Sequence, residues 1–192
     1  MAARRTILLA VALSLPPAWA LWAALRHMLP PIAADPLTFA LGCSGAALLL
    51  TLALGIEAVA HERLFHASID PLAGADSRRL VINQRYVQNT LEQAALFVPG
   101  LILLALHIGD LRTVAATAVV WTLGRWMWWI GYHRDPAWRA LGAFSMAISL
   151  ITLVYGVGAF AHALAGWAGV AGVLLPFALT EAWLFHALRR PG

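Results

Sequence analysis

Six apolar stretches run along the chain, and polar turn residues separate them. Each is close to the length of about 20 residues that a helix needs to cross the hydrocarbon core of a bilayer. Lipid offers no partner to free backbone groups, so we expect helices rather than irregular segments. The breaks carry turn signals such as Asp35-Pro36, Gly109-Asp110 and Asp135-Pro136. We therefore predict membrane helices at residues 6–25, 37–60, 85–107, 113–132, 139–162 and 168–187.

The composition supports an all-α integral membrane protein and excludes several classes of site. Of the 192 residues, 61% are hydrophobic and 11% are charged, whereas soluble domains are about 25% charged. All 13 cationic side chains are arginine, so a Schiff-base lysine and a Walker-A phosphate loop are excluded. The single cysteine excludes an internal disulfide. The net charge of +4 is too thinly spread for a nucleic-acid surface, and the seven histidines lack the spacing of a metal site.

The arginines are distributed unevenly between the two sides that six crossings would create. Only Arg26 and Arg112 fall on one side. The opposite side has Arg139 at its edge and receives Arg4, Arg5, Arg63, Arg78, Arg79, Arg134, Arg189 and Arg190. Because cytoplasmic loops are enriched in arginine, we predict a multi-pass protein of the bacterial inner membrane with both termini in the cytoplasm. A cleavable signal peptide ending near Ala18-Trp19-Ala20 is the alternative for the first stretch, although apolar sequence continues beyond it.

Two neighbouring predicted helices carry polar residues where charge is costly. Arg85, Asn89 and Glu92 stand at i, i+4 and i+7, which places them on one helical face. Arg125, Trp128 and Tyr132 stand at i, i+3 and i+7 on the next helix, so they also share a face. One interpretation is a cavity on the cytoplasmic side for a small zwitterion or polyanion. The other is a helix with solvated first turns beside a snorkelling arginine and an aromatic belt.

The set of spacings resembles the MAPEG superfamily, the membrane-associated proteins in eicosanoid and glutathione metabolism. The resemblance covers roughly residues 37–162 and rests on four pieces: Arg85-x-x-x-Asn89-x-x-Glu92, Gly124-Arg125, Gly131-Tyr132 and Arg139-Ala-Leu-Gly142. It implies a MAPEG-like four-helix bundle at 37–162 that assembles as a homotrimer. Residues 1–36 and 163–192 would then each add one transmembrane helix, which makes six in total.

The resemblance also implies a function and the residues that perform it. Glutathione would bind between subunits near the cytoplasmic side, and the protein would be a transferase or peroxidase acting on lipophilic electrophiles or hydroperoxides from the bilayer. Arg139 would be the catalytic residue that stabilises the thiolate, and the glutathione-binding residues would be Arg85, Asn89, Glu92, Arg125 and Tyr132.

Other residues keep a second interpretation open. The chain departs from the family pattern at Gln88, Gln93, Trp128 and Ala140, which leaves fewer polar contacts for glutathione. These departures favour a non-enzymatic module of the same fold that binds lipid or a partner helix, so the sequence leaves open whether the protein is an enzyme. A transporter is a weaker option, because the chain shows no inverted repeat.

Overall fold

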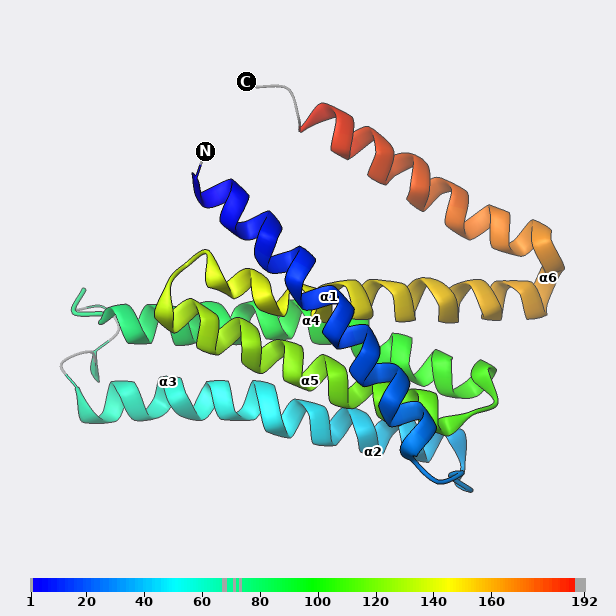
Figure 1. The fold of residues 1–192 in the computed structure, drawn as a ribbon, viewed down its shortest axis with the longest axis horizontal. Coiled ribbons are helices and arrows are strands. Elements are labelled where there is room, and N and C mark those ends of the chain that lie inside the picture. The colour runs from blue at the N-terminus through cyan, green and yellow to red at the C-terminus, as the bar shows by residue number, and fades with distance from the viewer. Residues whose placement is uncertain (1, 67–68, 71, 73, 189–192) are drawn as a thin grey trace.

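The described chain contains helices and no strand, which confirms the predicted all-α class. The structure is a computed structural model, and it describes residues 2–66, 69–70, 72 and 74–188. In chain order the elements are α1 (Ala2–Met28), α2 (Pro36–Leu48), the π-helical turn η1 (Leu49–Ala53), α3 (Leu54–Phe65), α4 (Arg78–Ile108), α5 (Leu111–Arg134), the 3-10 turn η3 (Trp138–Gly142) and α6 (Ala143–Ala187). In Figure 1, α2–α3, α4, α5 and the first part of α6 run along the long axis, and α1 crosses in front of them obliquely.

The helix that carries the first polar group begins earlier than the apolar pattern indicated. The predicted start was residue 85, but α4 begins at Arg78. Ser77 caps it, because its side chain accepts a hydrogen bond from the backbone N–H of Leu80 at 3.0 Å. Arg85 consequently lies about two turns inside the helix. The interpretation of these residues as a solvated first turn or two stays a prediction, and the exposed side chains of Arg85 and Glu92 are compatible with it.

α2 and α3 form one apolar helix interrupted by the π-helical turn η1. A π turn widens the helix and displaces carbonyl groups from their usual partners. The carbonyl of Leu50 in this turn accepts a hydrogen bond from Trp126 Nε1 at 2.6 Å, while Thr51 Oγ1 donates to Ala47 O at 2.7 Å. The irregular turn therefore provides a direct hydrogen bond between the α2–α3 helix and α5.

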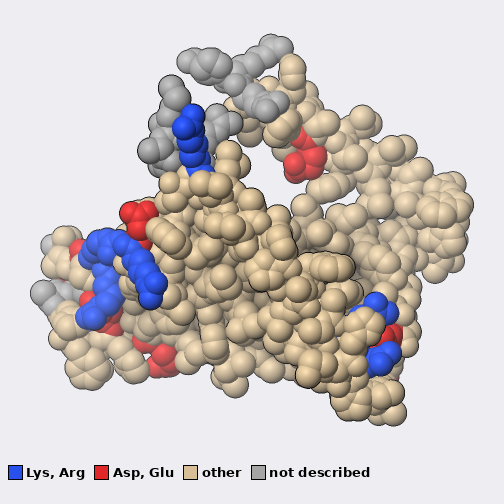
Figure 2. Space-filling view, in the orientation of Figure 1, with Lys and Arg blue, Asp and Glu red and all other residues tan. Residues whose placement is uncertain are grey.

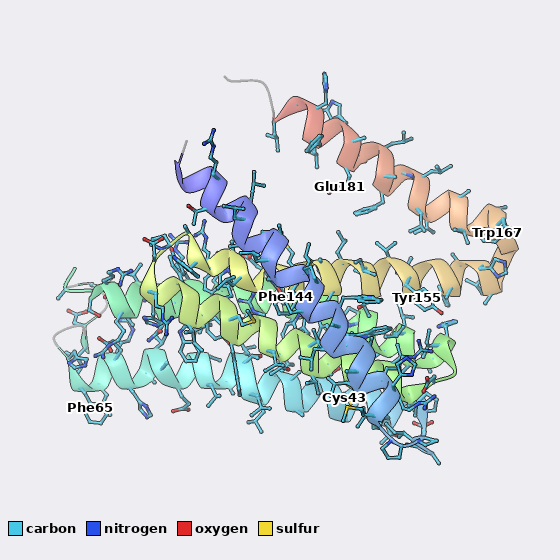
Figure 3. The ribbon with its side chains drawn as sticks, in the orientation of Figure 1. Cys43, Phe65, Phe144, Tyr155, Trp167 and Glu181 are labelled. Carbon is cyan, nitrogen blue, oxygen red and sulfur yellow. The ribbon has the colours of Figure 1, made fainter. Side chains whose placement is uncertain are left out.

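α6 includes two of the predicted stretches and breaks between them. Its 45 residues contain non-helical backbone at Ala165 and Gly166, and the φ of +59° at Gly166 is a left-handed conformation that glycine adopts without a Cβ clash. After the break the helix swings away from the bundle and returns toward the chain start (Figure 1). Trp167 stands at this bend (Figure 3), and its ring packs edge-on against His162 with centroids 5.1 Å apart.

The core lies between α2, α4 and α5, and α6 closes over it. Phe97 and Trp121 are fully buried and stack with ring centroids 4.3 Å apart. Trp121 Nε1 donates to Ser149 Oγ of α6 at 2.8 Å. Gly100 lets α4 and α6 approach closely, because a Cβ at this position would stand 2.8 Å from the backbone nitrogen of Leu153.

Four of the described helical segments are long and apolar enough to cross a membrane: Arg5–Met28, Pro36–Phe65, Arg78–Ile108 and Trp138–Ala187. In Figure 2 most charged side chains gather toward the two ends of the long axis, and a broad uncharged band separates them. Six crossings and a cytoplasmic location of both termini stay predictions. Of the arginines behind the charge bias, Arg189 and Arg190 lie outside the described residues, as does the side chain of Arg4.

Candidate functional site

An exposed row of polar side chains follows one face of α4. Arg85 Nη1 donates to Gln88 Oε1 at 3.4 Å, and Gln88 Nε2 donates to Glu92 Oε1 at 3.2 Å. We call these three exposed residues the α4 stripe. Asn89 lies half-buried beside it and accepts a hydrogen bond from Gln93 Nε2 at 3.4 Å. The predicted one-face arrangement of Arg85 and Glu92 is thus present, with Gln88 as the link between them.

The inward face of α4 is also polar, and its groups have partners on the neighbouring helices. The buried Asn83 Oδ1 accepts from Trp129 Nε1 at 2.9 Å and lies 3.0 Å from His133 Nε2. Gln93 is buried, and its Oε1 accepts from Ser145 Oγ at 3.0 Å. Because hydrocarbon cannot satisfy such groups, an amide on a membrane helix is best placed toward other helices.

Arg125 of α5 is fully buried against this inward face. Its Nε and Nη2 atoms donate to Thr90 Oγ1 at 3.3 and 3.0 Å. The guanidinium carbon lies 5.4 Å from the Tyr86 ring centroid and 5.2 Å from that of Trp128, which is the geometry of cation–π contacts. Within the described chain, Nη1 has no hydrogen-bond partner and no carboxylate pairs with this arginine. Among the described residues, the contacts of this buried cation are therefore two ring faces and one hydroxyl, and none carries a negative charge.

Trp128 connects Arg125 to the other two candidate residues. The Tyr132 ring meets the Trp128 ring edge-on, with centroids 5.0 Å apart. The guanidinium carbon of Arg139 lies 5.3 Å from the Tyr132 ring centroid. Arg139 is exposed and Tyr132 is half-buried, so this pair borders the surface of the subunit while Arg125 lies beneath it.

Glycines allow η3 to lie directly on α5, and this contact places Arg139. A Cβ at Gly131 would collide with the Trp138 backbone, and a Cβ at Gly142 would collide with the backbone of Gly124. Any larger residue at these positions would push η3 away from α5. The close approach is what brings the Arg139 side chain over the Tyr132 ring.

Five of the six predicted site residues fall into two groups within one subunit, and Asn89 belongs to neither group. Arg125, Tyr132 and Arg139 are joined through Trp128, whereas Arg85 and Glu92 belong to the α4 stripe. Asn89 is adjacent in sequence to Thr90, which holds Arg125, but its own contact is with Gln93. Among the described residues the structure records no contact between the stripe and the group around Trp128.

Two residues of this region were missed from the sequence. Tyr86 and Thr90 contact Arg125 directly. Trp128, which was expected on the same face as Arg125 and Tyr132, links these two residues. A usable signal existed, because residues 83, 86, 90, 93 and 97 repeat at alternating steps of three and four and so share one face.

A second ionic cluster at the same end of the bundle joins α3 to α4. Glu62 is buried and accepts from Arg79 Nε at 2.6 Å and from Ser77 Oγ at 2.8 Å. Glu62 thus turns toward the start of α4, where it supports the residue that caps that helix.

Comparisons with known proteins agree with the resemblance in the sequence. Over 72 residues the chain is 39% identical to the uncharacterized protein sll1147 of Synechocystis sp. (strain ATCC 27184 / PCC 6803 / Kazusa), which is 38% of this chain and 52% of that relative. The chain therefore spans about half the length of the curated relative it matches. No solved structure matches it. The model of the MAPEG family matches residues 40–162, more than half of the chain. With its long apolar helices, the chain is a multi-pass integral membrane protein and belongs to the MAPEG family.

Proposed function

We propose that the protein is a glutathione-dependent transferase or peroxidase that acts on lipophilic electrophiles or hydroperoxides from the bilayer. Membership of the MAPEG family supports this role, since its members generally use glutathione. The observation that carries the proposal is the buried Arg125, which has an unpartnered Nη1 atom and no carboxylate partner within the described chain. A guanidinium is well suited to carboxylates because it can hold them through paired hydrogen bonds.

The proposed site is completed by a second copy of the chain. Arg85 and Glu92 lie at the surface of the subunit, and so does Arg139. In a homotrimer the α4 stripe of one subunit would face the group around Trp128 of the next. Asn89, Arg125 and Tyr132 would then complete the contacts to glutathione, with Glu92 receiving its ammonium group.

Arg139 would be the catalytic residue. Bound glutathione would supply a thiolate nucleophile, and positive charge beside the sulfur favours the deprotonated form. The Arg139 side chain is exposed and has only the Tyr132 ring beneath it in the described structure. Its donors are therefore open to a ligand that binds over this surface.

A direct test separates binding from thiolate formation. Purified protein would be titrated with glutathione by calorimetry, the thiolate measured by ultraviolet absorbance, and turnover followed with a chlorodinitrobenzene-type electrophile. We expect Arg139→Ala to bind glutathione but to lose thiolate absorbance and turnover. The matched control is Arg134→Ala, at the end of α5 that leads to η3, and it should keep the thiolate absorbance and the turnover. Absence of glutathione binding to the unmodified protein would refute the enzyme proposal.

The second candidate is a non-enzymatic membrane module that binds lipid or a partner helix. The burial of Arg125 favours it, because a guanidinium that is 0% exposed and bonded to Thr90 can serve to hold α4 and α5 together. Charge reversal at Glu92 tests this candidate in a preparation whose subunits are counted by native mass spectrometry. Loss of assembly in a protein that never bound glutathione would support the module.

A further inference from the structure

A cleft of about 440 Å³ separates the crossing helix α1 from the bundle. Its walls are apolar, with Trp19 of α1, Leu104 of α4, Val120 of α5 and Ile148 of α6 among the lining residues. Trp19 is 70% exposed, so the cleft is open sideways toward the surrounding lipid. Figure 3 shows α1 crossing α6 between Phe144 and Tyr155, which both line this cleft.

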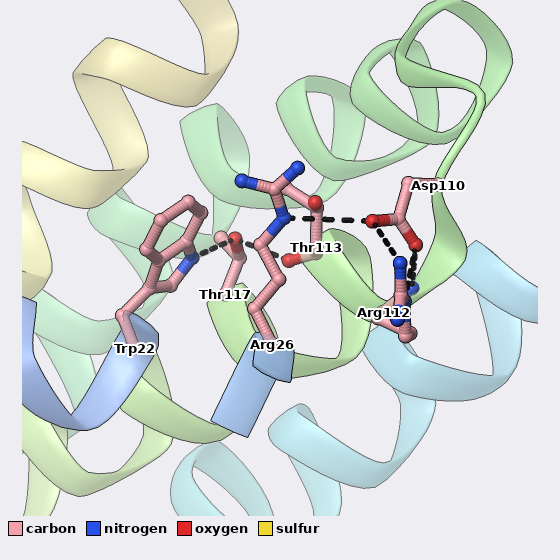
Figure 4. Close-up of polar contacts among 6 residues, drawn as sticks. All are labelled: Trp22, Arg26, Asp110, Arg112, Thr113 and Thr117. Carbon is pink, nitrogen blue, oxygen red and sulfur yellow. Dashed lines mark hydrogen bonds and ion pairs between the residues drawn. The ribbon is translucent and has the colours of Figure 1, made fainter. Parts of the chain in front are cut away.

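One end of the cleft carries a net positive charge. Arg26, which lines the cleft, donates from Nε to Asp110 Oδ2 at 3.4 Å. Arg112 donates to the same carboxylate from Nε at 2.9 Å and from Nη2 at 3.2 Å. Two arginines share one carboxylate, which leaves an excess charge of one. In Figure 4 both terminal nitrogens of Arg26 turn away from Asp110, so they are available to another acceptor.

A buried hydroxyl at the same end lacks a partner. Thr113 lines the cleft, is 5% exposed, and its Oγ1 makes no hydrogen bond within the described chain. Threonines further along α5 donate to the carbonyl four residues back, as Thr117 does to Thr113 O at 2.7 Å. The residue four before Thr113 is Gly109, which lies before the start of α5. The helix therefore offers this hydroxyl no carbonyl, and a buried donor without an acceptor is costly.

We propose that this cleft binds an anionic glycerophospholipid of the bilayer. One acyl chain lies against the apolar walls, and the phosphate oxygens accept hydrogen bonds from Arg26 and Thr113. The second acyl chain extends through the open side of the cleft and remains in the bilayer. A phosphodiester carries a single negative charge, which matches the excess positive charge.

This site is separate from the proposed glutathione site. The α1 residues that line it lie before residue 40, where the match to the family model begins. The charged end is formed by Arg26, Asp110 and Arg112, and none of these belongs to the α4 stripe or to the group around Trp128. A test of lipid binding in the cleft is therefore independent of whether the protein binds glutathione.

The test counts lipids that stay bound when the full chain is released from nanodiscs. The discs contain phosphatidylglycerol and phosphatidylcholine with identical acyl chains, and retained lipids are weighed by native mass spectrometry. We expect phosphatidylglycerol to be retained about fivefold over phosphatidylcholine, the preference of one partly exposed charge pair. Arg26→Gln should bring this ratio close to one, and the matched control Arg134→Gln should leave it unchanged.

A second variant tests the acyl-chain half of the site. Ala147 lines the cleft, so Ala147→Leu narrows it and should lower retention of both lipids while the preference for the anionic headgroup remains. Unchanged melting and elution of each variant show that it is folded. Equal retention of the two phospholipids by the unmodified protein overturns the proposal, as does an unchanged ratio in Arg26→Gln. Retention of added oleate in place of phosphatidylglycerol overturns the assignment to a phospholipid.

Discussion

The guanidinium of Arg125 donates two hydrogen bonds to a single atom, the hydroxyl oxygen of Thr90, from Nε at 3.3 Å and from Nη2 at 3.0 Å. Both residues are 0% exposed. Hydrogen bonds to charged groups contribute about 1.5–3 kcal/mol each in mutational series, and a buried charge that loses its partner costs more than the bond itself was worth. This contact is therefore a principal connection between α4 and α5.

Thr90→Val should destabilise the protein by about 2 kcal/mol, because it leaves the buried guanidinium without its acceptor. Thr122→Val is the matched control, since Thr122 is buried on α5 but donates only to Ala118 O of its own helix at 2.9 Å. The unfolding free energy of both variants can be measured by chemical denaturation in detergent micelles. Equal losses for the two variants would contradict the role assigned to Thr90.

Gly100→Ala should destabilise the packing of α4 against α6 by about 1–3 kcal/mol. The added Cβ would stand 2.8 Å from the Leu153 backbone, and overpacking of this kind forces backbone shifts. Gly42→Ala is the control, because nothing lies within 4 Å of a Cβ at Gly42 and alanine is the better helix former. Thermal melting should therefore shift down for Gly100→Ala and stay level or shift up for Gly42→Ala.

Stability should fall at low pH through Asp110. The hydrogen bond from Arg112 holds the pKa of this carboxyl below its ordinary value of 3.8. The unfolded chain thus binds a proton more readily, so the ionised carboxylate stabilises the fold above pH 3.8, and this stability is lost as the pH falls through the lowered pKa. Asp110→Asn keeps a good cap for α5 but removes the charge. The variant should show a weaker fall in melting temperature between pH 5 and pH 2, measured in steps of about half a unit.

Tyr132→Phe should lower kcat/KM for glutathione conjugation by about tenfold, the loss expected for one hydrogen bond to a charged ligand. This prediction rests on the proposed function. Phenylalanine keeps the ring that packs against Trp128 and beneath Arg139, so the melting temperature should not change. Steady-state kinetics check the prediction, and an unchanged kcat/KM in an active enzyme would remove Tyr132 from the site.

Much of the helical architecture could be predicted because it depends on local properties. Apolar length and the turn signals at Asp35-Pro36 and Gly109-Asp110 indicated where helices lie, and spacing alone placed Arg85 and Glu92 on one face of α4. The start of α4 was missed because its first turns are polar, and a window that looks for apolar residues does not include them. The family was also predicted, because its motifs are short and local, and the match to residues 40–162 confirms it.

What the sequence determined by itself is that the chain is helical, belongs in a membrane and is a member of the MAPEG family, since apolar length and motif spacing are properties of single segments. Tertiary structure decided which side of each helix faces inward, that Thr90 and two aromatic rings surround Arg125, and that α1 crosses the bundle to form a cleft. In lipid the outer surface of a helix is as apolar as its packing surface, so hydrophobic periodicity does not distinguish the two. Only the neighbouring helices, which satisfy polar groups that lipid cannot, determine the orientation.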